Sequence, residues 1–134
     1  VMSQKNFKAR KIMGQSVVAR KNGYSFVDSL PQIAVFNYMK VPLGYGAKYE
    51  KMENDLNRSP DKNAPRVAWS YSKRLDLNGE NVGWNYLTAD FFKSYKAAMQ
   101  ARANTPSYSK DLLQAFKSRK LVKSEMAGKV ISLR

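Results

Sequence analysis

The residues of this sequence best suited to chemistry are basic, and they gather toward the two ends of the chain. Residues 1–22 carry six lysines and arginines and no acid, and residues 104–134 carry seven against two acids. Residues 23–103 are nearly balanced, so most of the formal net charge of +14 lies at the ends. Clustered cations bind polyanions, and each phosphate that they neutralise releases condensed counterions. The candidate residues for binding nucleic acid or an acidic partner are Lys5, Lys8, Arg10, Lys11, Arg20, Lys21, Lys117, Arg119, Lys120 and Lys123.

Other kinds of site find little support. The sequence contains no cysteine and no histidine, which excludes disulfides, thiolate or imidazole metal sites, and Ser-His-Asp or Cys-His catalysis. Glu50 and Glu53 could share a helix face and hold a hard cation, but the basic residues among them favour a solvated surface of ion pairs. Gly44-Tyr45-Gly46 favours a plain turn over a phosphate-binding loop. We therefore expect a protein that is not an enzyme and uses no cofactor or metal.

The strongest local signal is a β-hairpin over residues 66–87. Two stretches in which apolar and polar residues alternate are joined by Asn78-Gly79, and both turn residues tolerate the positive φ of a type I′ turn. The turn predicts three facing pairs, which are Tyr71 with Tyr86, Lys73 with Trp84, and Leu75 with Val82. It also predicts a cation–π contact between Lys73 and Trp84.

The aromatic face of this hairpin has two interpretations. Its members are Trp69, Tyr71, Trp84 and Tyr86. Aromatic residues on a sheet can stack nucleic-acid bases, but they can equally form a core. Because the opposite face is small or polar throughout, the alternation favours the core.

The remaining elements follow from weaker patterns. Residues 16–28 predict a second hairpin about Asn22-Gly23, and residues 33–41 fit either a strand or a short helix. Helices are expected over residues 47–58 and from an N-cap at Thr88 to about residue 103. Ser109 can cap a last helix, which turns basic from Lys117 and ends near Gly128. Cations there can bind a partner, or they can simply complement the negative end of the helix dipole.

These elements predict an α+β fold in a small single domain, with one β-hairpin (about 66–87), a possible N-terminal hairpin and two C-terminal helices. The expected organisation is a basic N-terminal arm at residues 1–22, followed by a single compact domain at residues 23–134 that ends in a basic helix. The longest apolar run, residues 33–36, is far too short to span a bilayer. The basic start of the chain resembles an organelle-targeting segment more than a secretory signal. The sequence leaves two locations open, an organelle and a virion.

The expected function is non-enzymatic, structural binding of nucleic acid, either DNA or RNA. The basic ends would hold the phosphate backbone with little sequence specificity, as in a ribonucleoprotein component or a coat or packaging protein. The alternative is a basic linker or assembly subunit that binds acidic protein surfaces within a larger complex. Exposed aromatic residues away from the core would support this alternative, and the candidates are Tyr24, Tyr38, Tyr45 and Tyr108.

Overall fold

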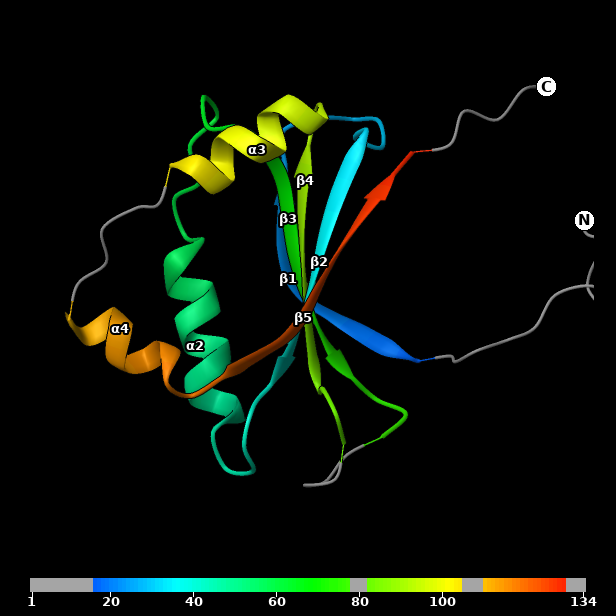
Figure 1. Cartoon of the computed structure of the whole chain (residues 1–134). Coiled ribbons are helices and arrows are strands. Elements are labelled where there is room, and N and C mark those ends of the chain that lie inside the picture. Colours follow the sequence, from blue (N-terminus) through cyan, green and yellow to red (C-terminus); the bar gives the residue numbers. More distant parts are fainter. Residues whose placement is uncertain (1–15, 78–81, 105–109, 130–134) are drawn as a thin grey trace, which may run out of the picture.

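Five strands form one antiparallel sheet in a computed structural model that describes residues 16–77, 82–104 and 110–129. The strands are β1 (Val18–Ser25), β2 (Ile33–Lys40), β3 (Arg66–Arg74), β4 (Tyr86–Phe92) and β5 (Lys120–Gly128), and the helices are α2 (Gly46–Leu56), α3 (Tyr95–Ala103) and α4 (Lys110–Phe116). The spatial order is β1-β3-β4-β2-β5, so β1 and β5 are the two edge strands. All three helices lie on one side of the sheet (Figure 1). We call the opposite side the open face, because no helix of the described residues covers it.

The core lies between the sheet and α2. Its larger cluster joins the helix-facing residues of β2, β3 and β4 to one side of α2, and it contains Met39, Val41, Tyr49, Met52, Trp69, Tyr71 and Tyr86. Tyr71 and Tyr86 are each 2% exposed. The assignment of the hairpin aromatics to the core is thus confirmed for Trp69, Tyr71 and Tyr86. It is wrong for Trp84, whose ring packs against Tyr38 on the open face.

The expected layout of a single hairpin with two C-terminal helices is wrong, and the register predicted for residues 66–87 is wrong as well. β3 and β4 pair antiparallel, but Tyr71 lies opposite Thr88 and Lys73 opposite Tyr86. The strands lie two residues out of the expected register: the Asn85 carbonyl oxygen accepts from the Arg74 backbone N–H at 2.9 Å, while the Asn85 side chain bonds to the chain that follows β2. This side chain accepts from the backbone N–H of Val41 and donates to the Val41 carbonyl oxygen, at 2.8 Å each. Asn78-Gly79, the expected turn, lies outside the described residues.

The N-terminal hairpin is also wrong, because residues 18–25 form one continuous strand through Asn22-Gly23. A bulge at Lys21 shifts the pairing of β1 with β3 between Arg20 and Asn22. Gly23 serves close approach of the two backbones here, since a Cβ atom would lie 2.5 Å from the Trp69 carbonyl oxygen. Residues 18–22 of the expected basic arm therefore belong to the sheet.

The basic C-terminal helix is wrong too. α4 ends at Phe116, and residues 120–128 form β5, which pairs antiparallel with β2. The local sequence is ambiguous here because a bulge between Leu121 and Lys123 interrupts the alternation of side chains in β5. Pairing with the edge of β2 therefore decides that these residues form a strand and not a helix. The sequence leaves residues 33–41 open between strand and helix, and residues 33–40 form the strand β2.

The two remaining helices differ in how well they were predicted. The helix expected at residues 47–58 is confirmed as α2. Thr88 does not cap a helix but is buried in β4, where Phe91 and Phe92 point to opposite faces of the sheet. Ser94 caps α3 instead, and its hydroxyl accepts from the Ala97 backbone N–H at 3.1 Å.

Candidate functional site

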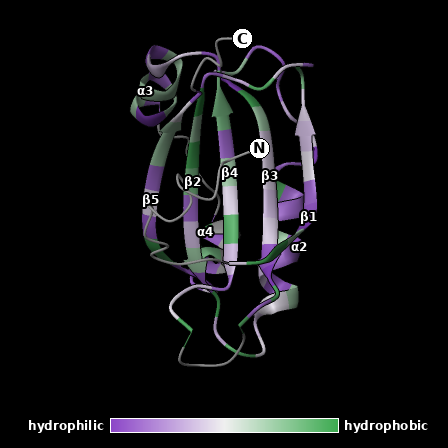
Figure 2. Ribbon diagram, turned by 90° about the vertical axis from the view of Figure 1, so that its right-hand side faces the viewer, coloured by the Kyte–Doolittle hydropathy of each residue, from purple (hydrophilic) through white to green (hydrophobic). Residues whose placement is uncertain are grey.

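Each of the two basic segments of the sequence supplies cations to the same face of the sheet, one at each edge. Arg20 lies in β1 and Lys123 in β5, four strand spacings apart, which corresponds to about 19 Å. Both side chains belong to the open face, which is turned toward the viewer in Figure 2. The register aligns one row of open-face residues across all five strands. This row runs from Arg20 through Ser72, Leu87 and Tyr38 to Lys123.

Aromatic rings and cations form a continuous chain of contacts beside this row. The Lys123 ammonium lies 4.6 Å from the centroid of the Tyr38 ring, and Tyr38 meets Trp84 edge-on at 5.1 Å between centroids. On the far side of Trp84, the Arg74 guanidinium lies 4.3 Å from the ring centroid. Arg74 is also paired with Asp76 at 2.9 Å and its side chain is only 10% exposed, so it holds Trp84 in place. The rings of Tyr38 and Trp84, both partly exposed, remain on the surface.

A pair of lysines lies next to this chain, where β2 ends and β5 begins. Lys40 is directly opposite Lys120 on the open face. Like charges directly opposite in a sheet destabilise it. The Lys40 ammonium donates to the Val82 carbonyl oxygen at 2.6 Å, while Lys120 is exposed. We refer to Arg20, Tyr38, Trp84, Lys120 and Lys123 together as the open-face cluster.

One acid opposes this cluster. Glu125 forms an ion pair with Lys123 at 2.8 Å on the open face. The hydrogen bond with Glu125 raises the pKa of Lys123, and Lys123 in turn lowers the pKa of Glu125. Burial, followed by the charge of Glu125, raises the pKa of Tyr38. At neutral pH the cluster therefore presents a charged lysine beside a neutral phenol ring.

The other candidate residues lie elsewhere. Lys21, in the bulge of β1, pairs with Glu50 of α2 at 3.1 Å. Lys117 is exposed in the turn after α4 and forms no ion pair within the described ranges. Arg119 points away from the open face and lines a cavity on the other side of the sheet. Lys5, Lys8, Arg10 and Lys11 lie outside the described residues.

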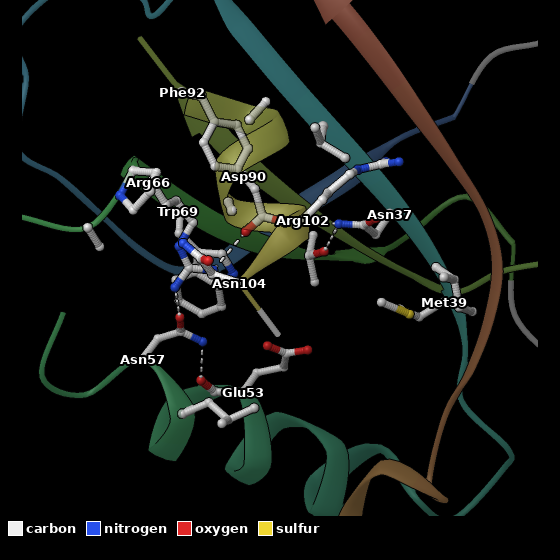
Figure 3. A pocket seen from close by; sticks show the side chains of 18 of the residues that line it. Asn37, Met39, Glu53, Asn57, Arg66, Trp69, Asp90, Phe92, Arg102 and Asn104 are labelled. Atoms are coloured by element: carbon white, nitrogen blue, oxygen red, sulfur yellow. Dashed lines mark hydrogen bonds and ion pairs between the residues drawn. The ribbon is translucent and has the colours of Figure 1, made fainter. Parts of the chain in front are cut away.

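This cavity is the second candidate site, with a volume of about 670 Å³ between the sheet and the helices (Figure 3). One wall of the cavity is a network of satisfied polar groups. Arg66 donates to Asp90 at 2.7 Å and to Asn57 at 2.5 Å, and Asp90 accepts a further bond from Asn37 at 3.0 Å. Most of the remaining lining is apolar and includes Val35, Met39, Trp69, Phe92, Phe116 and Leu121.

The carboxyl group of Glu53 stands apart from that network, although the Glu53 backbone carbonyl accepts from the Asn57 side chain at 2.8 Å. Glu53 is 6% exposed, on the buried side of α2, and Figure 3 shows its carboxyl group directed into the cavity. Burial raises its pKa, against the lowering effects of the Tyr49 hydroxyl and the Arg119 charge. The expectation that Glu53 belongs to a solvated surface is wrong, because α2 turns it toward the sheet together with Tyr49 and Met52.

Sequence reasoning named Tyr38 as a candidate exposed aromatic residue, but it missed Trp84, which it assigned to the core. In residues 33–40, aliphatic side chains occupy one parity of the strand (Ile33, Val35, Met39) and both rings occupy the other (Phe36, Tyr38), which predicts that the rings lie on the face opposite the aliphatic core. Within residues 16–77, 82–104 and 110–129, no group of three or more acidic residues could hold a metal ion. No helix in those ranges is long and apolar enough to cross a membrane.

The sequence matches no protein-family model and no curated protein. Function must therefore be inferred from the residues of the two sites.

Proposed function

We propose that this protein is a non-enzymatic nucleic-acid-binding protein and that the open-face cluster binds a single strand. The observation that carries the proposal is the contact chain of cations and rings on a sheet face that no described helix covers (Figure 2). Cations bind phosphates regardless of sequence, and exposed aromatic rings stack on bases. Such binding fits a ribonucleoprotein component or a packaging protein.

Edge strands carry lysines for another reason as well, because charge discourages pairing with a second sheet. That explanation accounts for Lys120 and Lys123 at an edge. It does not account for Tyr38, which lies in the inner strand β2, or for Trp84, which precedes the inner strand β4; both rings are fixed by flanking cations. Exposed rings held in one orientation favour a partner with flat aromatic groups.

The test is binding of a fluorescently labelled 12-nucleotide single strand, followed by anisotropy in 50 mM and 200 mM salt. Stacking on one base contributes about 1–3 kcal/mol, so Tyr38→Ala should weaken binding by about fivefold or more. Tyr95→Ala is the matched control, because Tyr95 is exposed at the start of α3 on the helix side. It should bind like the parent protein.

Polyglutamate tests the alternative of an acidic protein partner. The proposal expects polyglutamate to compete poorly with the single strand, since it offers charge but no bases. Equal competition, with no effect of Tyr38→Ala, would instead support a basic linker or assembly subunit. Absence of binding at 50 mM salt, or binding that salt leaves unchanged, would refute the proposal.

A further inference from the structure

The cavity on the helix side of the sheet has the dimensions and lining of a small-molecule site. Its volume of about 670 Å³ lies within the range of about 300–1,000 Å³ that is common for such sites. Its walls come from strands β2 to β5 and from the three helices, so it is built by most of the fold. A mainly apolar lining with a few polar groups suits a ligand that has an apolar body and one polar end.

The polar group left without a partner in this cavity is Arg119. Its Nε atom is fully buried and has no hydrogen-bond partner among the described residues. The rest of the guanidinium is fixed, because Nη1 contacts the Met39 sulfur at 3.2 Å and the group lies 4.9 Å from the Phe116 ring centroid. A buried N–H group of a cation without an acceptor is costly, and an anionic oxygen is its strongest partner.

The charges of the lining point the same way. Arg66 and Asp90 neutralise each other in their ion pair, which leaves Arg119 and Glu53 as the charged groups inside the cavity, while Arg102 is exposed at its rim. Glu53 forms no ion pair within the described ranges, and burial raises its pKa, which favours its neutral form. The cavity therefore has an excess of positive charge, and a ligand with one negative charge complements it.

We propose that the cavity binds a small amphipathic carboxylic acid, whose carboxylate pairs with the guanidinium of Arg119 and whose apolar body packs against Trp69 and Phe92. This site is separate from the open-face cluster, and the proposal does not depend on nucleic-acid binding.

Tryptophan fluorescence can test the proposal, because the chain has two tryptophans and only Trp69 lines the cavity. In the Trp84→Phe protein, Trp69 is the sole reporter. Octanoate should change its emission in a saturable manner. The neutral probe 1-octanol should bind about tenfold more weakly, because it lacks the charge-assisted hydrogen bond.

Arg119→Gln in this background should abolish the preference, so that octanoate and octanol bind within about twofold of each other. Lys117→Gln is the matched control, since it removes a nearby exposed cation outside the cavity, and it should keep the preference. Equal affinity for the two probes, no saturable change with octanoate, or a preference that survives Arg119→Gln would overturn the proposal. Loss of the preference in Lys117→Gln would overturn it as well, by revealing nonspecific attraction.

If Arg119→Gln does not fold, the methyl resonance of Met39 replaces it as the readout, because the Met39 sulfur contacts Arg119. In the Trp84→Phe protein this resonance should shift during an octanoate titration. A Met39 resonance that stays constant up to saturating octanoate would overturn the proposal.

Discussion

Replacing Lys120 and Lys123 together by glutamine removes the two exposed cations that β5 adds to the open face. Each phosphate contact on a single strand contributes a salt slope of about −0.7 in log K against log salt. Loss of one contact then weakens binding by about eightfold at 50 mM salt and about threefold at 200 mM. For the Lys120→Gln, Lys123→Gln protein, the expected loss is about 65-fold at 50 mM and about tenfold at 200 mM, with a slope shallower by about 1.4.

The assay is anisotropy of a labelled single strand at four salt concentrations between 50 and 200 mM, with circular dichroism as a check of folding. Lys96→Gln is the control, because Lys96 is an exposed lysine of α3 on the helix side. It should leave the slope unchanged. An equal loss at every salt concentration, or the same change in slope for Lys96→Gln, would refute the assignment of phosphate contacts to β5.

Glu125→Gln should have the opposite sign. Glu125 holds the Lys123 ammonium at 2.8 Å, so a phosphate must compete with this carboxylate for the same cation. Its removal should strengthen binding at 50 mM salt by up to about eightfold, the size of one contact. Unchanged or weaker binding would mean that Lys123 does not meet phosphate.

Three further predictions concern stability and are checked by urea denaturation. Burial raises the pKa of Glu53 in the folded state above the ordinary value of about 4.5, so its contribution to stability is full below that pH and is lost as pH rises through the raised pKa. The free energy of unfolding of Glu53→Gln relative to the parent should therefore increase from pH 4 to pH 8, and a constant difference would contradict the burial of this carboxyl group. Gly23→Ala should lower the free energy of unfolding by about 1–3 kcal/mol, because the added methyl group collides with the β3 backbone. Gly83 has open space around it, so Gly83→Ala should change stability by less than about 0.5 kcal/mol. Equal effects of the two substitutions would contradict the close approach of β1 and β3 at Gly23. Ser94→Ala removes the N-cap of α3 and should cost about 1 kcal/mol, and no loss would mean that the cap contributes nothing.

Local patterns were a good guide where one surface of an element is buried. The spacing of Tyr49 and Met52 predicted α2, and the alternation around Trp69 and Tyr71 identified a core strand, because each pattern reports a single buried side. The register was not predictable, since Asn85 bonds both to Arg74 of β3 and to the Val41 backbone, which lies 44 residues away in the chain.

The candidate site was predictable in composition but not in placement. The basic residues were found from charge alone, yet β5 reads as the end of a basic helix until the edge of β2 is available to pair with it. Arg119 and Lys120 are adjacent in sequence, but they serve the cavity and the open face, respectively. The path of the chain from α4 into β5 determines which of the two side chains points to each side of the sheet, and no local sequence pattern predicts that path.

The pairing of β5 with β2 also has a consequence for the order of folding. The two strands are joined across more than 80 residues, as between Tyr38 and Lys123, so this contact is among the slowest to form. β5 supplies two cations to the open face, and Leu121 to the cavity wall. During synthesis, a chain that has not yet released residues 119–128 from the ribosome should have neither site complete, and both should be completed together when β5 pairs with β2.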